Sequence, residues 1–153
     1  MNILRAIFGG GYAKGSAMLT SDFVRAQLEA VPCLAGAEIF LKDGDYLGLE
    51  AGRLQDFLAD KVWTPGLKYK PEVFDCDDFA ACARADVLRA GSAEGFKRAL
   101  FIAEVCHYPV TGAYHDALLV MDAAGVLWLY EPQNGSMTKD LPSKIREAVE
   151  IWG

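Results

Sequence analysis

Three residues that together make a thiol nucleophile occur in order along this 153-residue chain. Cys76 stands in the string Phe-Asp-Cys-Asp-Asp-Phe-Ala at 74–80, His115 follows in a strand-like stretch, and Glu131 comes sixteen residues later. A catalytic thiol needs a base that takes its proton, and the base needs a carboxylate that orients it. The pattern therefore predicts a catalytic set of Cys76, His115 and Glu131.

The apolar spacing after Cys76 predicts a helix that runs to about Ala90, with Asp75 as its cap and Gly91 as its stop. A thiol in the first turn of a helix lies at the positive end of the helix dipole, which favours the thiolate. We therefore expect Cys76 to be an activated nucleophile. The remaining cysteines are expected to be free thiols that fill the core: Cys33, Cys82 and Cys106.

The turn at 123–125, Ala-Ala-Gly, determines how His115 and Glu131 can meet. A three-residue hairpin loop closed by glycine places these two residues as diagonal neighbours on one face of a sheet. Glu131 is then expected to hold the Nδ1 proton of the imidazole while Nε2 faces Cys76. Gln133 is an equally well placed partner for the imidazole in this register.

The acidic neighbours Asp75, Asp77 and Asp78 oppose formation of the thiolate, because negative charge raises a thiol pKa. A hard cation would cancel that charge, and carboxylates on one helical turn are oxygen ligands suited to calcium. We therefore expect calcium dependence, with Asp77 and Asp78 as ligands and Asp75 as a further candidate. The alternative is that these aspartates cap the helix, are solvated, or pair with Lys68 and Lys70.

Composition limits the partners and the number of domains. The chain carries 15 basic and 21 acidic residues, a net charge of -6, without a basic stripe, so nucleic acid is an unfavourable partner. A glycine-rich stretch predicts a flexible N-terminal arm over 1–18 and a single domain over 19–153. The apolar N-terminus is too short for a signal peptide or a membrane span, so we expect a chain that is cytoplasmic or exported without a signal peptide.

Apolar periodicity predicts the remaining elements. Helices are expected over 21–30, around 54–58 and over 141–152, a hairpin over 38–49 around an Asp-Gly turn, and antiparallel strands over 98–106, 114–122 and 126–131. The predicted architecture is an α+β fold in which the Cys76 helix packs on an antiparallel sheet that carries His115 and Glu131.

The segment 69–80, His115 and the run 131–133 resemble a known family. They are similar, in order and approximate spacing, to the papain-like cysteine protease domain of Marasmius oreades agglutinin and its relatives. More distantly, the Cys-Asp-Asp-Phe-Ala string is similar to bacterial transglutaminase-like peptidases. The resemblance implies a papain-like fold and calcium-linked protease activity, with Asp77 and Asp78 at the positions of metal ligands. It covers roughly 67–135, and sugar binding does not carry over from it, because we expect no room in the chain for a separate lectin domain.

These residues predict a cysteine-dependent amide hydrolase, a papain-like peptidase with a peptide or amide substrate. Cys76 attacks the carbonyl, His115 transfers the proton to the leaving amine, and Glu131 orients His115. Acyl transfer to an amine is chemically close to hydrolysis. Two alternatives are a catalytically silent module of the same fold that binds calcium or another ligand, and a structural module attached through the N-terminal arm.

Overall fold

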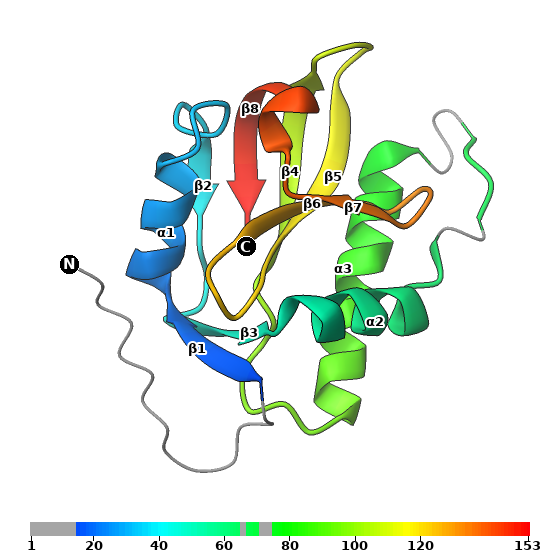
Figure 1. Cartoon of the computed structure of the whole chain (residues 1–153). Coiled ribbons are helices and arrows are strands. Elements are labelled where there is room, and N and C mark those ends of the chain that lie inside the picture. The colour runs from blue at the N-terminus through cyan, green and yellow to red at the C-terminus, as the bar shows by residue number, and fades with distance from the viewer. Residues whose placement is uncertain (1–14, 65–66, 71–74) are drawn as a thin grey trace.

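The computed structural model describes residues 15–64, 67–70 and 75–153 (Figure 1). Its helices are α1 (Ser21–Glu29), α2 (Ala51–Lys61) and α3 (Cys76–Ala93), with a short 3-10 turn at Leu141–Ser143. Its strands are β1 (Ser16–Thr20), β2 (Glu38–Phe40), β3 (Asp45–Leu49), β4 (Ile102–Pro109), β5 (His115–Met121), β6 (Leu127–Glu131), β7 (Ser136–Thr138) and β8 (Ile145–Trp152). β1 and β3 form a two-stranded sheet, and the others form a six-stranded sheet in the order β2-β8-β4-β5-β6-β7.

The predicted N-terminal arm, 1–18, falls mostly outside the described residues. The part of it that is described forms β1 from Ser16 onwards, paired antiparallel with β3. Residues 71–74 of the motif string also fall outside.

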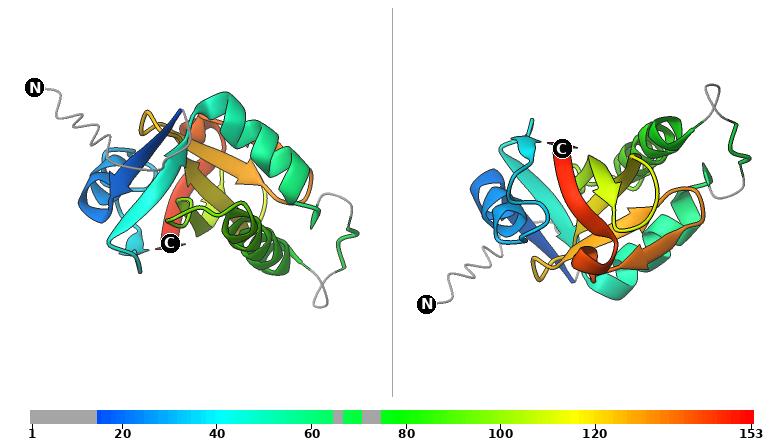
Figure 2. Two further views of the ribbon diagram at one scale, coloured as in Figure 1. Left: turned by 90° about the horizontal axis from the view of Figure 1, so that it is seen from below. Right: turned by 90° about the horizontal axis from the view of Figure 1, so that it is seen from above.

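The six-stranded sheet carries a separate apolar core on each face. In β5, Ala117 and Leu119 pack in one core with Val24 of α1, while Leu118 packs in the other with Ala83 of α3. Both views in Figure 2 show α1 and α3 on opposite sides of the strands. Because successive strand residues point to opposite faces, each position of β5 belongs to only one side.

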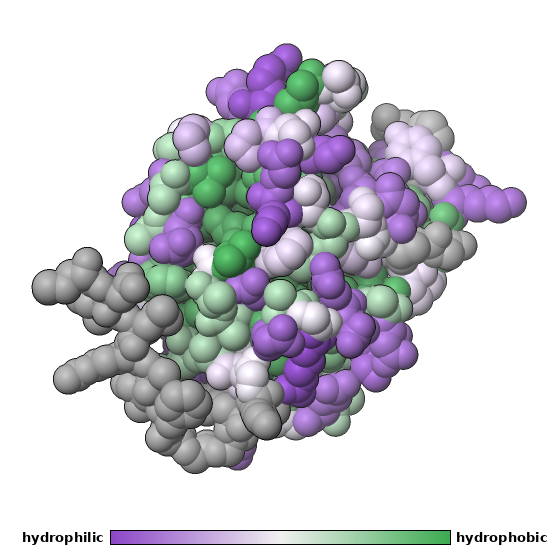
Figure 3. Space-filling view, viewed as in Figure 1, coloured by the Kyte–Doolittle hydropathy of each residue, from purple (hydrophilic) through white to green (hydrophobic). Residues whose placement is uncertain are grey.

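Hydrophobic side chains on the face seen in Figure 3 gather over α1, β2 and β8, whereas hydrophilic side chains dominate over α2. Within the described residues, no helix is both long and apolar enough to cross a membrane.

Several predicted elements are confirmed. Helix α1 begins after Thr20, whose hydroxyl accepts a hydrogen bond from the Phe23 amide at 3.2 Å. Helix α3 begins at Cys76 behind a capping box between Asp75 and Asp78. β4, β5 and β6 are antiparallel neighbours, as expected. All four cysteines are free thiols.

The predicted end of the Cys76 helix is wrong. Helix α3 continues to Ala93, and Gly91 is buried within it. A Cβ atom at Gly91 would lie 3.0 Å from the ring of Phe96. This glycine therefore allows Phe96 to pack closely against the helix and does not end it, while the positive φ of 76° falls at Gly95.

The predicted C-terminal helix is also wrong, because residues 145–152 form the strand β8. The buried positions Ile145, Ala148 and Ile151 recur every third residue, which is typical of a helix. This spacing arises because the β8–β4 pairing has two register shifts, between Cys106 and His107 and between Tyr108 and Pro109.

The predicted hairpin over 38–49 is the third incorrect element. Both strands form, but β2 pairs parallel with β8, and β3 pairs antiparallel with β1. The Asp-Gly pair therefore connects strands of two different sheets, and Gly44 is not among the described glycines with positive φ.

The turn between β5 and β6 forms as predicted, with the Asp122 amide donating to the Val126 carbonyl at 3.0 Å. Gly125 has a φ of 81°, and a Cβ atom there would lie 2.6 Å from the Phe23 ring. We expect Gly125→Ala to lower the free energy of unfolding by about 2 kcal/mol, because it adds a left-handed strain and a clash. The control is Gly44→Ala, where a Cβ atom meets nothing within 4 Å. Urea denaturation measures both, and equal losses would contradict the expectation.

Candidate functional site

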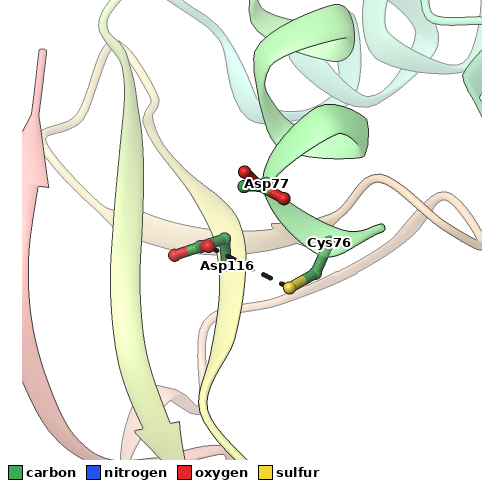
Figure 4. A group of neighbouring side chains, drawn as sticks. All are labelled: Cys76, Asp77 and Asp116. Atoms are coloured by element: carbon green, nitrogen blue, oxygen red, sulfur yellow. Dashed lines mark hydrogen bonds between the residues drawn. The ribbon is translucent and has the colours of Figure 1, made fainter. Parts of the chain in front are cut away.

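Cys76 lies at the start of α3, and its thiol points toward Asp116 of β5 (Figure 4). The thiol Sγ lies 4.0 Å from the Asp116 Oδ2 atom. Burial is the main cause that raises the pKa of Cys76, and the charges of Asp116 and Asp75 raise it further. The environment therefore favours the protonated thiol, which is the weaker nucleophile.

His115 and Glu131 do meet, as the predicted turn requires. The imidazole Nε2 lies 2.7 Å from the Glu131 Oε2 atom, and the backbone N–H of Gln133 donates to the other carboxylate oxygen, Oε1, at 3.1 Å. The partner of the imidazole is thus Glu131 and not the Gln133 side chain. The carboxylate contacts Nε2, and the predicted contact with Nδ1 does not form.

The predicted set is divided between the two faces of the sheet. His115 points to the same side as His107, its cross-strand partner, and the two rings lie 5.5 Å apart. Asp116 follows it in β5 and points to the opposite side, toward Cys76. Alternation along β5 therefore directs the imidazole away from the side of Asp116, and the thiol and the imidazole of these described residues form no hydrogen bond with each other.

Two overlapping groups of side chains around the start of α3 could hold a metal ion. Donor atoms of Cys76, Asp77 and Asp116 lie within 4.8 Å of one another, and so do those of Asp75, Asp77 and Asp78. Asp77 belongs to both groups, and its pKa is lowered mainly by a hydrogen bond with the Asp75 carboxyl.

Asp116 is the buried member of these groups. It is 9% exposed, and its Oδ1 atom has no hydrogen-bond partner among the described residues. A buried carboxylate oxygen without a partner is costly, because desolvation is not compensated. Asp116 was not among the predicted site residues, although its position next to His115 in a predicted strand places it on the opposite face of the sheet.

The α3 side of the sheet also carries a row of polar and aromatic residues on its outer strands. Cross-strand pairing aligns Glu38, Glu150, Cys106 and Asp116 in one row, and Phe40, Trp152, Glu104 and Leu118 in the next. We call five residues of these rows, together with Tyr108 of β4, the acidic-aromatic face: Glu38, Phe40, Glu104, Tyr108, Glu150 and Trp152.

The aromatic part of this face is ordered by contacts between side chains. The rings of Phe40 and Trp152 are stacked, with centroids 4.1 Å apart and an interplanar angle of 15°. The Trp152 indole N–H donates to the Glu150 carboxylate at 2.9 Å. Phe40 and Tyr108 are each 39% exposed and Trp152 is half-buried, so this aromatic surface is partly open to solvent.

The acidic part of the face is adjacent to the Cys76 region. The Glu104 carboxylate lies 3.7 Å from the Arg84 guanidinium of α3. Burial raises the pKa of Glu104, and the nearby charges of Asp116 and Asp77 add to the rise. Cys106 lies in the same row as Asp116. Burial and a hydrogen bond with Asp116 raise the pKa of Cys106 to about 12.

Comparison with known proteins finds the same fold in solved structures. The chain is similar to PSL1a in its E64 complex, with 26% identity and a TM-score of 0.73, over 88% of this chain and 50% of that one. It is also similar to Polyporus squamosus lectin bound to the epitope Neu5Aca2-6Galb1-4GlcNAc, with 24% identity and a TM-score of 0.71, over 88% and 49%. The chain thus spans about half the length of these structures. No protein-family model and no curated protein matches it.

The prediction of a papain-like α+β fold is wrong in its class. The arrangement of strands and helices is shared with Polyporus squamosus lectin over most of this chain. Helix α3 does contact β5, but a helix that lies on an antiparallel sheet occurs in many folds and does not define one family. The resemblance to a fungal agglutinin is supported only at the level of a fold shared with part of the two similar structures.

The predictions of a cysteine-dependent amide hydrolase, a papain-like peptidase and a peptide or amide substrate are also wrong. One of the two similar structures is that of a lectin bound to a sialylated epitope, and the likeness to it extends to the fold. The physical reason lies in the arrangement of the side chains. Cys76 faces the Asp116 carboxylate in place of an imidazole, and His115 points to the other side of the sheet.

Thiol labelling provides a check on this correction. We expect iodoacetamide to label Cys76 slowly at pH 8, because burial and the Asp116 carboxylate disfavour the thiolate. Asp116→Asn should label Cys76 several-fold faster, since it removes the neighbouring charge. His115→Ala should leave the rate unchanged. A rate that falls in His115→Ala, measured by peptide mass spectrometry, would contradict the separation of thiol and imidazole.

The ion pair between His115 and Glu131 makes stability depend on pH. The hydrogen bond with Glu131 is the main cause that raises the pKa of His115. Its stabilisation is therefore complete below the unfolded value of about 6.5 and is lost as the pH rises through the raised folded value.

We expect Glu131→Gln to lower the free energy of unfolding by about 1–2 kcal/mol at pH 6 and by clearly less at pH 9. Burial lowers the pKa of His107, and the charges of His115 and Glu131 also act on it, so the measured difference includes a contribution from His107. Urea denaturation across this pH range measures the effect. An equal loss at both pH values would rule out a protonated His115 as the stabilising partner.

Proposed function

We propose that this chain is a carbohydrate-binding domain of the lectin type. The observation that carries the proposal is the acidic-aromatic face, in which a stacked ring pair lies beside carboxylates on open strands. Aromatic rings present a flat apolar surface to the C–H side of a sugar ring. Ionised carboxylates accept hydrogen bonds from hydroxyl groups. The similarity to a lectin supports the proposal at the level of the fold.

The ring pair leaves only an outer ring face for a sugar, because Phe40 and Trp152 stack face to face and cover each other's facing sides. Phe40 comes from β2 and Trp152 from β8, so the aromatic surface spans two strands. The indole N–H fixes the Glu150 carboxylate next to the rings. This combination orients an acceptor before the ligand arrives, which reduces the entropy lost on binding.

A panel of immobilised neutral and sialylated glycans tests the proposal directly. We expect the purified chain to be retained by at least one glycan and to be released by the same sugar in solution. Lack of retention by every glycan would contradict the proposed function.

We further propose that a divalent cation, calcium, binds at the start of α3. The orphaned Oδ1 atom of Asp116 supports this, because a cation would provide the missing partner. Asp77 would bind the ion together with Asp116, and Asp75 and Asp78 extend the same acidic cluster. The Cys76 thiol is a poor ligand for a hard cation, so oxygen atoms would hold the ion.

A further inference from the structure

One group of side chains at the start of α3 combines a thiol with two carboxylates: Cys76, Asp77 and Asp116 (Figure 4). One ligand atom of each lies within 4.8 Å of the others, and the Cys76 Sγ atom lies 4.0 Å from the Asp116 Oδ2 atom. Tetrahedral zinc, with bonds of about 2.3 Å to sulfur and about 2.0–2.2 Å to oxygen, holds neighbouring donors about 3.3–3.7 Å apart. A small rotation of the side chains would therefore close the group around one ion.

The number and the chemical type of these donors suit zinc better than calcium. Calcium takes about six to eight oxygen ligands, and this group offers only two carboxylates. Thiolate sulfur is a soft ligand, which selects zinc over hard cations. Three protein ligands and one water molecule complete a tetrahedral zinc site. The Cys76 thiol, which contributes little to a calcium site, therefore has a role toward a thiophilic cation.

The charges and the burial of this group also favour a cation. Asp116 is 9% exposed, and its Oδ1 atom has no hydrogen-bond partner among the described residues. In the same part of the chain, neither Asp77 nor Asp116 forms an ion pair within 4.0 Å. Arg84 of α3 is engaged by the Glu104 carboxylate at 3.7 Å and donates to the Ile102 carbonyl at 3.3 Å. A bound cation would neutralise the two carboxylates and give the buried oxygen a partner.

We propose that Cys76, Asp77 and Asp116 bind zinc, with the Cys76 thiolate as one of the ligands. Binding breaks the S–H bond, forms a Zn–S bond and releases the proton to the solvent, without oxidation or reduction. Zinc uses two carboxylates that also belong to the calcium site proposed for this helix start, so the two ions compete. Zinc binding involves no residue of the acidic-aromatic face and does not depend on carbohydrate binding.

Cadmium tests the thiolate ligand, because it replaces zinc at thiolate sites and gives a sulfur-to-metal absorption band in the ultraviolet. We expect about one equivalent of cadmium to produce this band in the wild type and in Cys82→Ser, and to produce none in Cys76→Ser. Cys82 is the matched control, because it lies in the same helix and is half-buried like Cys76. A wild type without the band, or a band that persists in Cys76→Ser, would overturn the proposal.

Titration calorimetry with zinc supplies a second readout. In two buffers that differ in their enthalpy of protonation, the wild type should release about one proton per zinc ion near neutral pH, and Cys76→Ser should release none. Cys76→Ser should bind zinc at least about tenfold more weakly and still show the rise in unfolding temperature with calcium, because oxygen atoms hold that ion. Asp116→Asn should weaken the binding of both ions. Equal zinc affinity in the wild type and in either variant would overturn the proposal.

Further outcomes separate this inference from the proposed function. A cadmium band in a chain that no immobilised glycan retains would support the zinc site and contradict only carbohydrate binding. Retention on a glycan without a cadmium band would overturn only the zinc site. In the wild type, an excess of calcium should lower the apparent zinc affinity, and zinc affinity that calcium leaves unchanged would contradict the shared carboxylates.

Discussion

Replacing Trp152 with alanine is expected to lower the affinity for a bound neutral sugar at least thirtyfold. The substitution removes the ring stacked on Phe40 and releases the Glu150 carboxylate from its indole donor. Loss of a central aromatic contact of this kind costs about 2 kcal/mol or more. Titration calorimetry of the two proteins with Galβ1-4GlcNAc measures the change.

Two further variants separate recognition from stability. Trp152→Phe keeps a ring for stacking but loses the indole N–H, so its affinity should lie between those of the wild type and Trp152→Ala. Trp63→Ala removes a side chain that is 55% exposed and lies outside the acidic-aromatic face, and it should bind like the wild type. If Trp63→Ala caused the larger loss, the sugar would have to bind elsewhere.

Calcium is expected to raise the midpoint of thermal unfolding by about 5–10 °C when it is present at a hundredfold excess over its dissociation constant. The shift arises because calcium binds the folded chain and not the unfolded chain. Only folding brings the acidic groups together. Asp116→Asn should abolish the shift, since it removes a carboxylate ligand from the buried end of the site.

The behaviour of Asp116→Asn without calcium is a second readout. Because the Asp116 Oδ1 atom has no partner, loss of its charge should leave the calcium-free midpoint unchanged or raise it. Asp140→Asn is the matched control, because Asp140 is exposed and makes no side-chain cap hydrogen bond, and its calcium shift should equal that of the wild type. A full calcium shift in Asp116→Asn would remove Asp116 from the proposed metal site.

Local features of the fold could be predicted from the sequence. The helix caps at Thr20 and Asp75 and the turn closed by Gly125 depend on nearby side chains, and all three form. The same turn determines the register of β5 and β6, and the register brings His115 to Glu131. These contacts follow from the alternation of side chains along each strand and from the length of the turn, and both can be read from the sequence.

The side of the sheet that α3 covers could not be predicted in this way. Both faces of β5 are buried, so its sequence is apolar at odd and even positions alike and does not show which face meets a given helix. Helix α3 packs on the face that carries Leu118 and Asp116, and Cys76 therefore contacts a carboxylate. A thiol, a histidine and a glutamate in the right order were not enough to predict a catalytic set. The order along the chain does not show on which face of the sheet each side chain lies.

The acidic-aromatic face was missed for a different reason. Its residues come from β2, β4 and β8, which are distant in the sequence and adjacent in the sheet. β8 was predicted as a helix because its register shifts against β4 give the buried residues a spacing of three. Without that strand, Glu150 and Trp152 had no predicted place beside Phe40.

The most direct test of the central claim uses the three tryptophan indole N–H signals in a two-dimensional ¹H–¹⁵N spectrum. On addition of Galβ1-4GlcNAc, the account predicts that the Trp152 signal moves, while those of Trp63 and Trp128 stay in place. Trp128 provides an internal control, because its indole donates to Asp122 at 3.0 Å, away from the acidic-aromatic face. An unchanged Trp152 signal at a sugar concentration that saturates binding would contradict the assignment of this face as the carbohydrate site.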